Sequence, residues 1–251
     1  MRVVFNADDF GSHPRISHGI IEAMQRGVVR STTVLANMVT DEELSWLAKM
    51  PDISVGAHLN LTKGTPVTPF PLDFLDEHGG FSKELVFSPA GGPVLPADAV
   101  RAELEAQVSR LEAGGLSLDH LDSHHHVHGF ASVLDVVVKL ACDRGLAVRT
   151  TCPWMSAHLS AQGVRHPERL ITGFFGKNNI GEEHLMELLQ DVLESGVPVA
   201  EVMCHPGFSD GLPEGHTGYR EERELELQTL CSPGLAARLN EEGIEVAKYD
   251  V

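Results

Sequence analysis

Short apolar segments of strand length alternate with segments of helical periodicity along almost the whole chain. The clearest helix lies at residues 97–113, where Val100, Leu104, Val108 and Leu111 form one apolar stripe. The same criteria of period and length locate the other elements. Strands are predicted at residues 2–6, 32–37, 53–61, 116–122, 147–150, 199–204 and 244–249, and helices at residues 16–26, 42–49, 97–113, 132–144, 182–195, 221–230 and 235–242.

Regular alternation of strands and helices predicts the α/β class, with a parallel sheet covered by outer helices. Roughly seven strand–helix units favour a closed or nearly closed (β/α) barrel over an open doubly wound sheet, which stays the alternative. Residues 1–251 show no internal repeat and no linker, so a single domain is expected. Residues 63–96 interrupt the alternation with a segment rich in proline and glycine, and we interpret it as a functional insertion such as a lid or a substrate-binding loop.

Acidic and imidazole side chains follow the predicted strands at the points where those strands end. Ligand sites of parallel α/β folds lie at the carboxyl ends of the strands, so these side chains are expected to converge. The segments concerned are Asn-Ala-Asp-Asp-Phe-Gly (6–11), Gly-Ala-His-Leu-Asn (56–60), His-Leu-Asp-Ser-His-His-His-Val-His (120–128) and Cys-His-Pro-Gly (204–207).

A set of imidazoles and carboxylates is typical of a catalytic divalent metal site. Two histidines and one aspartate leave coordination positions for water and substrate. Asp8 or Asp9 together with His205 would supply a general base and a general acid. Each residue also has a structural explanation, because an Asp-Asp pair can cap a helix, His58 can pack in a core and His205 can form a turn.

Composition and charge indicate which partners and which cellular compartment to expect. With 19 Lys+Arg against 36 Asp+Glu the formal charge is −17, which argues against nucleic acid as the main partner. No apolar run is long enough to span a membrane, and the first residues lack the pattern of a signal peptide. The four cysteines are widely separated, which favours a reducing compartment, so a cytoplasmic protein is expected.

At these residues the chain resembles the YdjC/ChbG-like carbohydrate deacetylases. The matching segments are 6–11, 56–59, 120–128 and Glu-Val-Met-Cys-His-Pro-Gly at 201–207, in an order and spacing that fit the family over nearly the whole chain. The resemblance implies a (β/α) barrel that is incomplete or distorted, and a divalent metal, Mg²⁺ first and Zn²⁺ as the alternative. It also implies removal of the N-acetyl group from an amino sugar such as an acetylated chito-oligosaccharide.

Carried over to this chain, the resemblance also implies a role for individual residues. Asp9, His58 and His124 would bind the metal, Asp8 would be the general base and His205 the general acid, although which of Asp8 and Asp9 is base and which is ligand stays open. Buried contacts to the metal ligands, or contacts to the substrate, are expected from Asp122, His126 and His128. Apart from the resemblance, Arg149 at a strand end is a candidate contact for a sugar hydroxyl or acidic group, with a surface ion pair as the alternative. Trp154 is a candidate for stacking on a sugar ring, with ordinary packing as the alternative.

Other functions remain alternatives at this point. A metal-dependent sugar isomerase would share the barrel but usually has more carboxylate ligands, and a phosphoesterase would be expected to show a cluster of phosphate-binding arginines. A non-catalytic sugar-binding regulator would need neither base nor acid. Cytosolic barrels of this type often self-associate, so a homodimer is a state to consider.

Overall fold

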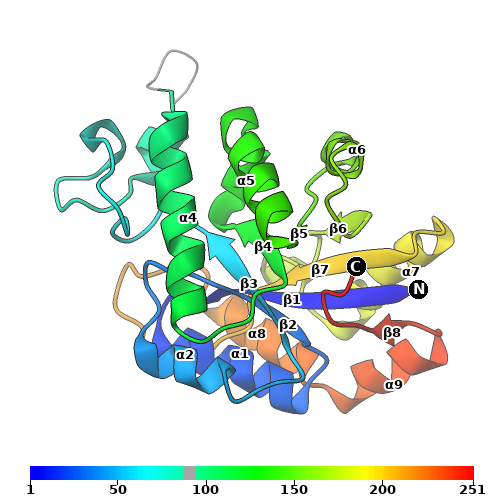
Figure 1. The fold of residues 1–251 in the computed structure, drawn as a ribbon. Helices are drawn as coiled ribbons and strands as arrows, with labels where there is room; N and C mark the ends of the chain where they lie inside the picture. Colours follow the sequence, from blue (N-terminus) through cyan, green and yellow to red (C-terminus); the bar gives the residue numbers. More distant parts are fainter. Residues whose placement is uncertain (88–93) are drawn as a thin grey trace.

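A curled sheet of parallel strands, surrounded by helices, forms the protein (Figure 1). The computed structural model describes residues 1–87 and 94–251. Within them the strands are β1 (Arg2–Phe10), β2 (Ser31–Val34), β3 (Ser54–Leu59), β4 (His120–Ser123), β5 (Ala147–Val148), β6 (Arg169–Ile171), β7 (Val199–Cys204) and β8 (Glu245–Val246). The helices are α1 (Pro14–Arg26), α2 (Asp41–Leu47), α3 (Lys83–Val86), α4 (Ala97–Ala113), α5 (Ala131–Arg144), α6 (Pro153–Ala161), α7 (Glu182–Glu194), α8 (Glu221–Leu230) and α9 (Pro233–Glu241), with short 3₁₀ turns η1 (Leu72–Phe74), η2 (His124–Gly129) and η3 (Lys177–Asn179).

The strand order is β5-β4-β3-β2-β1-β7-β6, and every pairing between these strands is parallel. Strand β8 pairs with the first residues of β1, whereas β2 pairs with its later residues. The sheet therefore curls into a half-barrel with β5 and β6 at its two ends. This arrangement confirms the predicted α/β class and the distorted (β/α) barrel.

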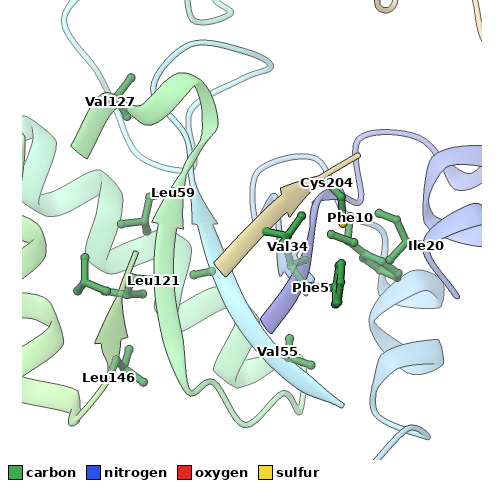
Figure 2. Packing of buried hydrophobic residues seen from close by; sticks show 14 of the residues in the cluster. Phe5, Phe10, Ile20, Val34, Val55, Leu59, Leu121, Val127, Leu146 and Cys204 are labelled. Carbon is green, nitrogen blue, oxygen red and sulfur yellow. The ribbon is translucent and has the colours of Figure 1, made fainter. Parts of the chain in front are cut away.

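The two faces of the sheet differ in polarity, because successive side chains of a strand point to opposite faces. Phe5, Phe10 and Val34 gather with Ile20 of α1 in the apolar layer beneath the helices (Figure 2). The alternate residues carry polar side chains into the half-barrel, where Ser31 donates a hydrogen bond to the side chain of Asn6. The inside of the half-barrel is therefore lined by polar groups that are available for chemistry.

Most of the predicted elements are present, with boundaries shifted by a few residues. Helix α1 begins at Pro14, two residues before its predicted start, because His13 caps the backbone N–H of Arg15. Helix α6 and strand β6 were not predicted. Both are short, and Pro153 and Pro167 interrupt the periodicity on which the prediction depended.

The insertion at 63–96 connects β3 to α4, and its residues 88–93 lie outside the described residues. Buried Glu103 of α4 fixes the beginning of the insertion, because its carboxylate accepts hydrogen bonds from the backbone N–H groups of Val67 (2.9 Å) and Thr68 (2.7 Å). An acidic residue of an amphipathic helix thus lies inside the protein, where it satisfies backbone donors of a loop.

Tyr249, which follows β8, closes one end of the polar interior. Its ring stacks on His120 of β4 with the ring centroids 3.7 Å apart, and its hydroxyl donates a 2.6 Å hydrogen bond to Glu201 of β7. Gly56 of β3 makes room for this arrangement, because a Cβ there would lie 2.6 Å from the His120 ring. The segment after β8 is therefore part of the barrel interior.

We predict that Tyr249→Phe lowers the free energy of unfolding by about 1–3 kcal/mol, because it leaves the buried Glu201 carboxylate without its hydroxyl donor. Urea denaturation monitored by circular dichroism measures the change. Ser160→Ala, which removes an exposed hydroxyl bonded to His166, serves as the control and should stay within about 0.5 kcal/mol of wild type. Equal stability of the two variants would contradict a structural role for the Tyr249 hydroxyl.

Candidate active site

A cavity of about 700 Å³ opens at the carboxyl ends of the strands, where the sequence predicted that the acids and imidazoles converge. It is bounded by the ends of β1, β3, β4 and β7, by the η2 turn and by the loop that precedes α8. Its lining includes Asp8, Asp9, His58, Lys63, Ser123, His124, His125, His126, Thr172, Phe175, Met203, His205, His216, Thr217, Gly218, Tyr219 and Arg223.

Three side chains at the base of this cavity present atoms suited to a divalent metal. Asp9 Oδ1 lies 3.0 Å from His124 Nδ1 and 3.5 Å from His58 Nε2, and the two histidine atoms are 3.4 Å apart. Asp9 Oδ1 is buried and has no hydrogen-bond partner among the described residues. A buried carboxylate oxygen facing two imidazole nitrogens is the arrangement expected of metal ligands, so these residues fit the implied ion.

The orientation of His58 is set by Asp122, which lies next to it in the sheet. Asp122 Oδ1 accepts a 2.7 Å hydrogen bond from His58 Nδ1, which leaves Nε2 directed at the cluster. Burial alone would lower the pKa of His58, but the charge of Asp122, the hydrogen bond to Asp122 and the proximity of the Asp9 carboxylate raise that pKa to about 10. The surroundings of this imidazole therefore strongly favour a positive charge, and a carboxylate behind a ligating histidine is the usual support of a metal site.

Asp9 is held from its other side by Arg223 of α8. The Nη2 atom of Arg223 donates a 2.5 Å hydrogen bond to Asp9 Oδ2, so only Oδ1 faces the two histidines. Asp9 also has a left-handed backbone conformation with φ of 72°, as do His125 and His126 with φ of 54° each. Non-glycine residues adopt this conformation rarely and at a cost of about 1–3 kcal/mol each, and here all three border the cavity.

Asp8, the neighbour of Asp9, has a different environment. Arg149 Nη1 and Nη2 donate hydrogen bonds of 2.7 Å to its two carboxylate oxygens. Burial raises the pKa of Asp8, but the guanidinium outweighs it and holds that pKa below its usual value. Asp8 is therefore ionised at neutral pH, the state required of a proton acceptor.

His205 lies opposite Asp8, with its Nε2 atom 3.9 Å from Asp8 Oδ2. Helix α8 holds both backbone polar groups of His205, because Glu226 accepts a hydrogen bond from its N–H and Arg223 donates one of 3.3 Å to its carbonyl oxygen. Desolvation lowers the pKa of His205 to about 4, against the opposing effect of Asp8 and Asp9. The imidazole is thus neutral at neutral pH. Cys204, the residue before it, is buried in the core.

The structure brings together six of the ten residues that the sequence singled out. Asp8, Asp9, His58, His124, His126 and His205 line the cavity. The other four lie elsewhere. Asp122, His128 and Arg149 are completely buried beneath the cavity, and Trp154 is exposed on α6, outside the cavity lining.

Arg149 has surroundings that differ from those expected of a substrate contact. Its guanidinium is enclosed by three carboxylates, Asp8 at 2.7 Å, Asp122 at 2.9 Å and Glu201 at 2.6 Å. None of its surface is exposed, so in this structure it acts on the site through Asp8 and Asp122 and does not reach the cavity. His128 likewise bonds within the fold, to Ser123 Oγ and to the carbonyl oxygen of Arg149.

Several cavity residues were not predicted from the sequence. Arg223 lies in helix α8 and Tyr219 just before it, and the composition of that helix is ordinary for a charged surface helix. Phe175 and His216 belong to no recognisable motif. Lys63 is the first residue of the insertion that the sequence marked as functional, and its ammonium donates to Ser12 Oγ (3.3 Å). For Lys63 the interruption of the alternation was a usable signal, whereas the others required the fold.

Comparison with known proteins shows the family of this chain. The family described as YdjC-like protein matches residues 2–241 of this chain. That match covers far more than half of the sequence. The chain belongs to the YdjC-like family. The resemblance predicted from the sequence segments is therefore confirmed.

Two relatives match nearly the full length of the chain. A protein of Vibrio parahaemolyticus named carbohydrate deacetylase is 35% identical over 99% of this chain and 95% of its own length. A protein of Proteus mirabilis named chitooligosaccharide deacetylase is 35% identical over 98% of this chain and 97% of its own. The crystal structure of a protein of Enterococcus faecalis, described as a putative cellobiose-phosphate cleavage protein, superimposes with a TM-score of 0.87 at 32% identity, covering 99% of this chain and 97% of that one.

We predict that Asp122→Asn lowers the affinity for a divalent ion about 10–100-fold, because the buried carboxylate orients His58. Titration calorimetry of the metal-stripped protein with Mg²⁺ and with Zn²⁺ measures the affinity. Because Asp122 also pairs with Arg149, Thr33→Val is a milder second variant. It removes an uncharged hydroxyl that contacts His58 Nδ1 and Asp122 and accepts a 3.3 Å hydrogen bond from Asn6 Nδ2. Affinities equal to that of the surface control Asp210→Asn would show that Asp122 does not support a metal ligand.

Proposed function

We propose that the protein is a metal-dependent carbohydrate deacetylase, which hydrolyses the N-acetyl group of an amino sugar and releases acetate. The observation that carries this proposal is one cavity in which the Asp9–His58–His124 cluster faces Asp8 and His205. The names of the relatives in Vibrio and Proteus support the same activity and the same class of substrate. An acetylated chito-oligosaccharide is the substrate we propose to test first.

Asp9, His58 and His124 would hold the metal through Oδ1, Nε2 and Nδ1. An ion bound there would polarise the acetamide carbonyl and lower the pKa of an adjacent water molecule. The two imidazoles suit Zn²⁺, the carboxylate suits Mg²⁺, and the cluster contains no thiolate that would select Zn²⁺ strongly. We propose Mg²⁺ as the resident ion, with Zn²⁺ as the alternative.

The protein's own groups would move the protons. Asp8 is ionised and is fixed by Arg149, so it is placed to accept a proton from the water that attacks the carbonyl carbon. His205 is placed to donate a proton to the nitrogen as the C–N bond breaks. His205 Nε2 is only 3.9 Å from Asp8 Oδ2. The neutral imidazole of His205 is therefore placed to receive the proton that Asp8 has accepted and to pass it to the leaving amine.

Metal removal tests the proposed activity directly. Acetate released from N,N′-diacetylchitobiose should fall to background after treatment with a chelator and return on addition of Mg²⁺ or Zn²⁺. His124→Ala should not respond to added metal, because one of the three proposed ligands is missing. Release of acetate by the metal-free protein would overturn the metal-dependent mechanism, and metal binding without acetate release would direct the search to isomerase or phosphoesterase substrates.

The adjacent carboxylates provide a matched pair of variants. Asp8→Asn should lower kcat about 10²–10⁴-fold, because it removes the proton acceptor, and should leave the metal affinity nearly unchanged, because Asp8 is not one of the three proposed ligands. Asp9→Asn should lower the metal affinity, and asparagine tolerates the left-handed backbone at this position. Steady-state kinetics and calorimetry on both proteins separate the roles. Full turnover in Asp8→Asn would show that Asp8 is not the base.

A further inference from the structure

One wall of the cavity is an exposed aromatic ring. The side chain of Phe175 is 45% exposed, although it borders a cavity whose base is buried. Its ring lies parallel to that of Tyr219, with centroids 4.4 Å apart and planes inclined by 1°. Of the large exposed hydrophobic residues that the structure describes, Phe175 alone belongs to the cavity lining.

The position of this ring pair is fixed by hydrogen bonds. The Tyr219 hydroxyl donates to Glu226 Oε1 (2.5 Å) and accepts from the backbone N–H of Gly176, the residue after Phe175 (3.0 Å). Glu226 is completely buried on α8 and also accepts the backbone N–H of His205. One carboxylate therefore connects the aromatic wall to the proposed general acid, which fixes the distance between them.

The distances from this wall to His205 are short. The ring centroid of Phe175 lies 5.5 Å from that of His205, and the centroid of Tyr219 lies 5.8 Å from it. In the proposed reaction His205 protonates the amide nitrogen, and that nitrogen is attached directly to the sugar ring. The sugar ring must therefore lie beside His205, on a side of the cavity where an exposed aromatic face is present.

We propose that Phe175, supported by Tyr219, is the residue against which the amine-bearing pyranose ring packs. This inference rests on the proposed deacetylase function and adds the element that selects a sugar ring. A pyranose exposes a face of C–H groups, whose burial against an aromatic ring is favourable and requires a flat, rigid partner. Lys63 and His216 also line the cavity, and Lys63 Nζ donates a hydrogen bond to the backbone carbonyl oxygen of His216. Their polar side chains would suit the hydroxyl groups of the sugar.

The test separates binding from turnover. Phe175→Ala should raise KM for N,N′-diacetylchitobiose about 10-fold, equivalent to about 1.4 kcal/mol, while kcat stays within about twofold. Phe175→Tyr keeps the flat ring and should retain the wild-type KM. Ser160→Ala removes an exposed hydroxyl outside the cavity lining and serves as the control, with no change expected.

A second readout does not depend on catalysis. Calorimetry in the presence of Mg²⁺ should show that the double variant Asp8→Asn/Phe175→Ala binds diacetylchitobiose about 10-fold more weakly than Asp8→Asn alone. The Phe175 assignment is wrong if wild type releases acetate, Phe175→Ala has the wild-type KM, and the double variant has the Kd of Asp8→Asn. If wild type binds the sugar without releasing acetate, the proposed reaction is wrong, and the Kd comparison still decides the role of Phe175. If wild type neither binds nor cleaves the sugar, both proposals fail.

Discussion

The buried guanidinium of Arg149 is the group on which the interior of the half-barrel depends. It follows β5, at one end of the sheet, yet it contacts Asp8 of β1, Asp122 of β4 and Glu201 of β7. Because β7 is next to the last strand at the opposite end, this contact joins the two ends of the sheet across its concave face. Three carboxylates buried together without a cation would be strongly disfavoured, so the same charge permits the acidic interior and favours the curvature.

Two consecutive aspartates acquire different properties from this arrangement. Asp8 has both oxygens bonded to Arg149, whereas Asp9 gives one oxygen to Arg223 and keeps the other directed at His58 and His124. The left-handed backbone at Asp9 turns the second carboxylate away from the direction of the first. Sequence reasoning left open which aspartate is the base, and these environments support Asp8 as base and Asp9 as ligand.

The sequence was sufficient to predict the fold class and the part of the site that lies at strand ends. Strand periodicity locates Asp8, His58 and His205 at one edge of a parallel sheet without knowledge of tertiary contacts. Arg223, Tyr219 and Phe175 could not be found in this way, because they reach the cavity from a helix and from loops whose paths depend on packing. Trp154 and Phe175 illustrate the limit, since both are exposed aromatic residues outside the predicted helices and strands, and only the fold distinguishes their positions.

The late position of Tyr249 in the sequence has a consequence for the order in which the protein can assemble. Asp8, Asp122 and Arg149 lie in the first 150 residues of the chain, Glu201 follows, and the tyrosine that bonds to Glu201 and stacks on His120 comes last. During synthesis from the N-terminus, strands β1 to β5 emerge with an acidic interior whose last hydrogen-bond donor has not yet been made. The polar interior is complete only after Tyr249 has reached Glu201 and His120, so strands β1 to β5 are made before the residue that closes the space between them.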